Sequence, residues 1–273
     1  MGSRCQAHGA LKPKPLGTLL RFPSTHHGLD MEETGVPKGD VIAPKMFTHP
    51  RPRAHWMGTR QVVVPSAGAQ LPGLLAMPAQ PSGLVVFAHG SGSSRHSPRN
   101  RAVAKHLVTG GLATLLFDLL TENEDQPHGQ MRSKRFDIEL LTARMVGAID
   151  WLATQKPLAH LPLGLFGAST GSAACLRAAA ARPQQVRAIV SRGGRPDLAF
   201  DVLAAVRSPT LLIVGSHDVD VLELNAWAAS HLQTSHAIKV VAGAGHLFEE
   251  PGCLEEAARL AREWFQTQLQ AES

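Results

Sequence analysis

The 273-residue sequence lacks several features that would place it in a class at first sight. No stretch approaches the roughly 20 apolar residues that a membrane-spanning helix needs, and the first residues lack the apolar core of a secretory signal. Three cysteines are an odd and sparse set, which excludes a disulfide framework and fits a reducing compartment. No group of His, Cys, Asp or Glu has the spacing of metal ligands. We therefore expect a cytoplasmic protein without membrane contact, bound metal or cofactor.

The net charge of +5 is concentrated in the N-terminal part of the chain. Residues 1–58 hold 8 Lys and Arg against 4 Asp and Glu, whereas the remaining residues hold 19 against 18. Nucleic-acid-binding domains combine a basic face with a recognisable motif, and the sequence has neither. We therefore expect no nucleic-acid partner. The sequence does not indicate the oligomeric state.

The first 57 residues differ in composition from the rest of the chain. Prolines recur there, as in Lys12-Pro-Lys-Pro15 and Pro50-Arg-Pro52, and apolar residues do not cluster. From Thr59 onward the pattern changes to short apolar runs that alternate with helical segments. We predict a poorly ordered extension over residues 1–57 and a single folded domain over residues 58–273.

Short runs that are apolar throughout dominate the predicted domain. Such runs are typical of strands buried on both faces, as in a parallel sheet covered by helices. Their alternation with helices predicts βαβ units in one doubly wound sheet, and the first two runs predict an antiparallel pair at its edge. The expected strands are 61–64, 71–77, 84–88, 112–117, 163–166, 188–190, 210–214 and 238–241, and the expected helices are 98–110, 133–155, 170–182, 219–232 and 251–269.

The segment Gly167-Ala-Ser169-Thr-Gly171 matches the nucleophile-elbow pattern Gly-x-Ser-x-Gly. This pattern needs a sharp turn from a strand into a helix, which exposes the serine hydroxyl and requires small residues on either side. A predicted strand precedes the segment and an alanine-rich predicted helix follows it. We therefore predict Ser169 as a nucleophile.

A serine nucleophile needs a base to take its proton and an acid to orient that base. With this elbow the acid and then the histidine follow the serine along the chain. Asp218 and His246 each come just after a predicted strand, at the sheet edge where open α/β sheets place their sites. Asp220 is the alternative acid, although an acid there also fits the first turn of a helix.

Two backbone N–H groups usually stabilise the negative charge that develops on the carbonyl oxygen during acyl transfer. One comes from the residue after the nucleophile, here Thr170, and the other from the loop after the third strand. That loop reads His89-Gly-Ser-Gly-Ser-Ser94, in which Ser91 is the expected donor and Gly92 the alternative. It lacks the Gly-Lys-Ser/Thr of a phosphate-binding loop. We expect the His89 side chain to bond to loop backbone.

Two arginines, Arg192 and Arg195, follow a predicted strand at the same sheet edge. They are candidates for binding a substrate carboxylate through paired hydrogen bonds. The interpretation that we favour is that they pair with Asp197 or Asp201 at the surface. The segment from 191 to 209 is too short for a helical cap, so we expect an open site.

Five stretches of the sequence together resemble one known family. They are Gly167–Gly171, Ser191–Leu198, Pro209–Gly215, Val221–Asn225 and Gly243–Pro251. These stretches resemble the dienelactone-hydrolase-like branch of the α/β-hydrolases, in particular the bacterial hydrolase segments that are often joined to a phosphoribosyltransferase domain. The resemblance covers about residues 58–269.

The resemblance implies the α/β-hydrolase fold: a doubly wound, mostly parallel sheet of about eight strands with helices on both faces and no large cap domain. It implies the triad Ser169, Asp218 and His246, with serine where dienelactone hydrolases have cysteine. We expect a serine hydrolase that cleaves a small-molecule ester, lactone or thioester through an acyl-enzyme. The alternatives are a serine peptidase or amidase with the same triad, and a non-catalytic hydrolase-like binding module.

Overall fold

The computed structural model of the protein describes residues 56–125 and 134–270. The predicted extension over residues 1–57 therefore lies outside the described residues, apart from its last two positions. Within these two ranges no helix is both long enough and apolar enough to cross a membrane.

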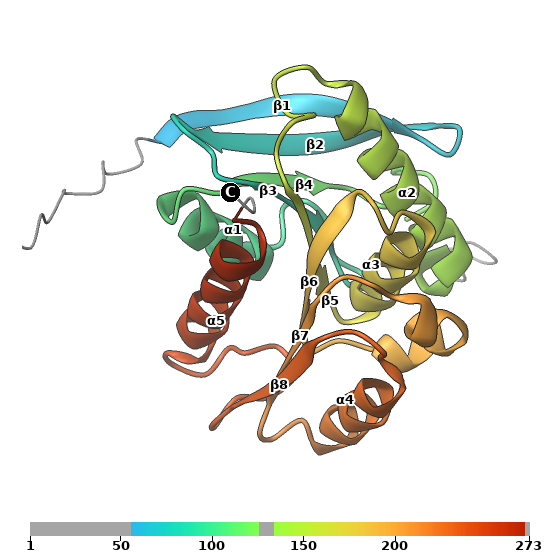
Figure 1. Ribbon diagram of the computed structural model, residues 1–273, viewed down its shortest axis with the longest axis vertical. Coiled ribbons are helices and arrows are strands. Elements are labelled where there is room, and N and C mark those ends of the chain that lie inside the picture. Colours follow the sequence, from blue (N-terminus) through green and yellow to red (C-terminus); the bar gives the residue numbers. More distant parts are fainter. Residues whose placement is uncertain (1–55, 126–133, 271–273) are drawn as a thin grey trace, which may run out of the picture. The chain divides into compact units, whose positions relative to one another are not determined.

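One eight-stranded sheet forms the centre of the domain, in the order β1-β2-β4-β3-β5-β6-β7-β8 (Figure 1). β1 and β2 pair antiparallel, β2 pairs antiparallel with β4, and the other neighbours are parallel. The predicted mostly parallel sheet with an antiparallel edge is therefore confirmed. The strands are β1 (Trp56–Ser66), β2 (Ala69–Pro78), β3 (Leu84–Ala88), β4 (Ala113–Phe117), β5 (Leu163–Ala168), β6 (Val186–Arg192), β7 (Thr210–Gly215) and β8 (His236–Val241).

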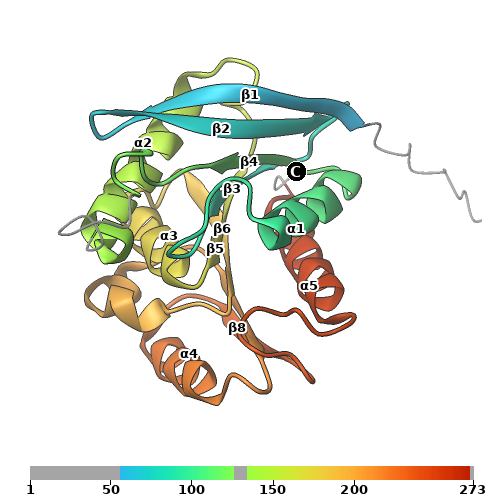
Figure 2. The same ribbon diagram turned by 180° about the vertical axis from the view of Figure 1, so that it is seen from behind.

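Helices cover both faces of the sheet (Figures 1 and 2). On one face lie α1 (Pro98–Thr109) and α5 (Cys253–Gln268), and on the other lie α2 (Ile138–Thr154), α3 (Thr170–Ala181) and α4 (Val219–His231). Local sequence sets where some of them begin. Ser97 and Asp137 cap α1 and α2, because each side chain accepts a hydrogen bond from a backbone N–H of the first helical turn.

The core consists of two apolar clusters, one on each face of the sheet. Leu141, Met145 and Leu176 belong to the cluster under α2 and α3, whereas Leu107 and Phe265 belong to the cluster under α1 and α5. β3, β4 and β5 are buried at every position, as their apolar runs predict. Each fully buried Leu or Phe contributes about 1.5–3 kcal/mol, so these clusters hold the strand ends that carry the site in fixed positions.

A 3₁₀ helix, Pro196–Ala205, fills the connection between β6 and β7. The sequence analysis did not predict it. The helix packs against α3 and α4, with Ala199 and Leu203 fully buried. The connection is thus occupied by a helix that packs on α3 and α4, which agrees with the expectation that it holds no cap domain.

Candidate active site

Ser169 lies at the turn between β5 and α3 with a strained backbone. Its φ is 51° and its ψ is −125°, in a region that residues with a side chain rarely adopt. A Cβ atom at Gly167 would lie 2.5 Å from Ser172 Cα, and one at Gly171 would lie 2.4 Å from the carbonyl oxygen of Ala88. Both glycines of the pattern are therefore needed for the close approach of strand and helix, as the nucleophile elbow requires.

The structure pairs His246 with Asp218. His246 Nδ1 lies 2.7 Å from Asp218 Oδ2, and the two side chains are 39% and 14% exposed. Asp218 occupies the position before the first residue of α4, where an Asp side chain ordinarily caps the helix, yet it makes no capping bond. Its carboxylate instead pairs with the imidazole of His246. The alternative acid, Asp220, is exposed in the first turn of α4.

A cavity of about 210 Å³ brings the predicted nucleophile and base together, since both Ser169 and His246 line it. Ser169 is only partly buried there. Three larger cavities, of about 380, 530 and 800 Å³, contain neither residue. We take the small cavity as the candidate site because it alone of these four combines a strained serine with an oriented histidine.

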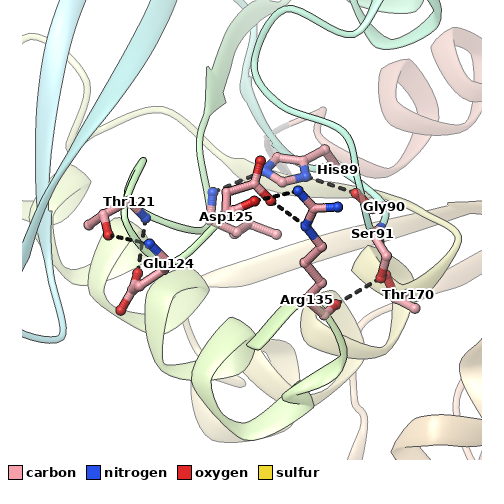
Figure 3. Close-up of polar contacts among 9 residues, drawn as sticks. His89, Gly90, Ser91, Thr121, Glu124, Asp125, Arg135 and Thr170 are labelled. Atoms are coloured by element: carbon pink, nitrogen blue, oxygen red, sulfur yellow. Dashed lines mark hydrogen bonds and ion pairs between the residues drawn. The ribbon is translucent and has the colours of Figure 1, made fainter. Parts of the chain in front are cut away.

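Hydrogen bonds from Ser91 connect the loop after β3 to Thr170 of the elbow and to the backbone of Arg135 (Figure 3). Ser91 N donates to Thr170 Oγ1 at 3.0 Å, the two hydroxyls lie 3.0 Å apart, and Ser91 Oγ donates to the carbonyl of Arg135 at 2.7 Å. The Ser91 N–H, expected as an oxyanion donor, thus has the Thr170 hydroxyl as its acceptor in this structure. The roles of Ser91, Gly92 and the Thr170 N–H in an oxyanion hole stay predictions.

Ion pairs hold the chain that receives this bond from Ser91. Arg135 Nε donates to Asp125 Oδ1 at 2.6 Å (Figure 3). Glu124 accepts from Thr121 N at 2.9 Å and lies 3.1 Å from the buried Arg144. Although burial opposes it, these donors hold the pKa of Glu124 below its ordinary value. Asp125 therefore braces the loop of Ser91 through Arg135, whereas Glu124 ties the loop after β4 to α2.

His89 anchors the other end of the loop after β3, as the sequence predicts. His89 is 7% exposed, with Nδ1 3.0 Å from the carbonyl oxygen of Gly90 and Nε2 3.0 Å from the backbone nitrogen of Leu119. The Leu119 N–H can only donate, so Nε2 must accept and the proton of the neutral ring resides on Nδ1. Burial lowers the pKa of His89 below its ordinary value, although the bond to Gly90 opposes this.

This arrangement predicts that the protein loses stability as the pH falls below about 6.5, the ordinary pKa of the ring. The unfolded chain then binds a proton that the folded His89 refuses, so the free energy of unfolding decreases with decreasing pH. Urea unfolding at pH 7.5 and pH 5 measures the loss, which should be smaller in His89→Gln. An equal loss in both proteins would contradict the assignment, since other histidines would then account for it.

The two candidate arginines have different surroundings. Arg195 makes two bonds to Asp197, at 2.9 and 2.7 Å, as the favoured surface interpretation expects. Arg192 pairs with neither of the acids named for it; it is buried and lines the cavity. Arg99 and Asn100 line the cavity as well and were missed. Their position in the first turn of a helix that follows a site loop is a signal that could have identified them.

Comparison with known proteins identifies the family to which this chain belongs. The model of a family described as "Alpha/beta hydrolase domain" matches residues 81–259. Two curated relatives from strains of Mycobacterium tuberculosis, each named "Putative phosphoribosyl transferase", are 55% identical over 205 residues. That match covers 75% of this chain and 45% of each relative. The chain therefore spans about half the length of the curated relatives that it matches.

Solved structures agree with this match. A dienelactone hydrolase from Anabaena variabilis is 52% identical, with 78% of this chain and 98% of that chain covered at a TM-score of 0.76. Est1E from Butyrivibrio proteoclasticus is 15% identical, with 76% and 98% covered at 0.64, which shows the shared fold alone. The Anabaena neighbour and the family model support hydrolase activity. The chain belongs to the alpha/beta hydrolase family, in its dienelactone-hydrolase-like branch.

Proposed function

We propose that the protein is a serine hydrolase that cleaves a small ester, lactone or thioester through an acyl-enzyme on Ser169. The observation that carries this proposal is a single cavity lined by a strained serine and by a histidine whose Nδ1 is held 2.7 Å from Asp218 Oδ2. Fixing Nδ1 leaves Nε2 to exchange a proton with the serine, which is the division of labour in serine hydrolases.

The proposed reaction has two steps. Ser169 Oγ attacks the carbonyl carbon while His246 takes the hydroxyl proton, and Asp218 stabilises the resulting imidazolium. The bond to the leaving group breaks, the leaving group receives the proton from His246, and an acyl-enzyme remains. Water, activated by the same histidine, then attacks the acyl carbon and releases the acid and the free serine.

The carbonyl oxygen needs donors in both steps. The N–H of Thr170 is the proposed first donor, and the N–H of Ser91 the proposed second one. Because the Ser91 N–H is bonded to Thr170 Oγ1 at 3.0 Å, it would exchange this hydroxyl for the substrate oxygen during the reaction. The exchange costs little, since one acceptor replaces another at the same N–H.

The Anabaena relative is named a dienelactone hydrolase, which supports lactones among the substrates to be tested. The curated relatives named as phosphoribosyl transferases extend well beyond the stretch that matches this chain, so their name supports no substrate for it. A peptidase or amidase would use the same three residues. A binding module is the alternative of a different class, and the presence of all three residues favours the enzyme.

Short acyl chains should be hydrolysed in preference to long ones. The cavity has a volume of about 210 Å³, and the connection between β6 and β7 adds no cap that could enclose a long chain. We expect kcat/KM for p-nitrophenyl acetate and butyrate to exceed that for the palmitate by more than about tenfold. Assays with matched p-nitrophenyl esters, p-nitroanilides, γ-butyrolactone and acyl thioesters measure this. A preference for palmitate would refute the size argument, and one for anilides would favour the amidase.

A further inference from the structure

Residues 192–195, the last residue of β6 and the turn that follows it, hold the backbone of the proposed nucleophile. The Ser169 N–H donates to the Arg192 carbonyl oxygen at 3.3 Å, and the Ser169 carbonyl oxygen accepts from the Arg195 N–H at 3.1 Å. Ser169 has a φ of 51°, and such strain persists only where the surrounding structure enforces it. Two bonds from one short segment therefore help to keep Ser169 in its strained conformation.

The same segment lies against the proposed base. Gly193 has a φ of 50°, and a Cβ atom there would lie 3.0 Å from the His246 carbonyl oxygen and 3.7 Å from His246 Cε1. Its N–H donates to the Ile213 carbonyl oxygen of β7 at 2.8 Å. Because residues 192–195 contact both Ser169 and His246, a shift of this segment would change how the two residues face each other.

Asn225 of α4 holds this segment at Gly194. Asn225 is fully buried, and its Nδ2 donates to the Gly194 carbonyl oxygen at 2.9 Å and to the Val221 carbonyl oxygen at 2.7 Å. Among the described residues, no other donor reaches the Gly194 carbonyl. A side chain at Gly194 would collide with the hydroxyls of Ser172 and Ser191, so the turn is tightly packed. Without Asn225 a buried carbonyl would lack its donor.

An asparagine at this buried position has a cost. Its Oδ1 atom is buried and has no hydrogen-bond partner, and such an atom destabilises the folded state. A leucine of similar volume would avoid this cost. One of the two bonds from Nδ2 goes to Val221 in the same helix, so it holds no other segment. What leucine could not supply is the bond from α4 to Gly194.

We propose that Asn225 is a positioning residue that keeps Ser169 and His246 in register by holding the Gly194 carbonyl. It acts through the backbone of residues 192–195. Because α4 begins directly after Asp218, the bond also joins this segment to the helix that follows the acid. The inference rests on the proposed function, since it takes Ser169 and His246 as the reacting pair.

Kinetics of two variants test the proposal. In Asn225→Ser the hydroxyl can still bond to the Val221 carbonyl of its own helix, but it is too short to reach Gly194. We expect kcat for p-nitrophenyl acetate to fall about 10- to 100-fold and KM to change less than about threefold, as a misplaced reacting group predicts. Asn225→Leu, which fills the same volume, should show the same loss. An unchanged kcat in either folded variant would overturn the proposal.

Ser208→Ala is the matched control. Ser208 is 2% exposed, and its Oγ donates at 2.9 Å to the carbonyl of Val186, the first residue of β6. The change therefore removes a similar buried bond at the end of the strand remote from Ser169. It should lower the melting temperature but leave kcat unchanged. If Ser208→Ala lowered kcat as much as Asn225→Ser, a general loss of stability would explain both, and the proposal would be wrong.

Hydrogen exchange gives a readout that does not depend on turnover. The amides of Ser169, Gly193 and Arg195 should exchange at least about tenfold faster in Asn225→Ser than in the wild-type protein, and at the wild-type rate in Ser208→Ala. Asn225→Leu replaces the serine variant if that variant does not fold. Unchanged exchange would overturn the proposal even if the protein is an active esterase. Faster exchange in a protein whose wild type neither turns over esters nor reacts with a fluorophosphonate would refute the proposed function alone.

Discussion

Replacing Ser169 with alanine should lower kcat/KM for p-nitrophenyl acetate by at least about 10³-fold, because the variant lacks the hydroxyl that we propose as the nucleophile. The same change should abolish labelling by a fluorophosphonate, which reacts only with an activated serine. The backbone at residue 169 should keep its φ of 51° in the variant, because alanine retains the Cβ of serine and loses only the hydroxyl. Thermal unfolding should therefore resemble that of the wild-type protein.

The control for this change is Ser230→Ala. Ser230 is an exposed serine on α4 whose hydroxyl bonds only to local groups of its own helix turn, among them the Trp227 carbonyl at 2.7 Å. The Ser230→Ala protein should retain both ester turnover and labelling by the fluorophosphonate. If a folded Ser169→Ala protein kept its esterase activity, the acyl-enzyme mechanism would be wrong. If the wild-type protein were neither labelled nor active on any ester, the binding-module alternative would replace it.

Local patterns in the sequence were sufficient to predict the nucleophile elbow and most of the strands of the sheet. β3 has the predicted bounds, Leu84–Ala88, because an apolar run buried on both faces ends abruptly at its loop. The turn at Ser169 was predictable for a similar reason. A side chain at Gly167 would collide with Ser172, and one at Gly171 would collide with Ala88 of the adjacent strand. The need for small residues therefore falls within five consecutive positions, where it can be recognised in the sequence.

Contacts between distant segments decided what the sequence could not show. The surroundings of Arg192 depend on Asn100, 92 positions away, and the partner of the Ser91 N–H lies 79 positions away. Neither pairing leaves a periodic trace in the sequence. The helix at Pro196–Ala205 was missed because a short 3₁₀ helix does not carry the 3.6-residue apolar repeat of an α-helix.

Asp218→Asn should lower kcat about 10⁴-fold, the loss that follows when an amide replaces the orienting carboxylate and the wrong imidazole tautomer is favoured. Asp218 is 14% exposed and bonds His246 Nδ1 instead of capping α4, so the variant should fold and retain its helix. Asp220→Asn is the matched control, because this exposed acid contributes only a favourable charge at the start of α4, worth about 0.3–1 kcal/mol of stability. Steady-state kinetics of both variants on one short ester decide between the two acids. A large loss in Asp220→Asn with an active Asp218→Asn would reverse the assignment, and equal small losses would show that the histidine does not depend on an orienting carboxylate.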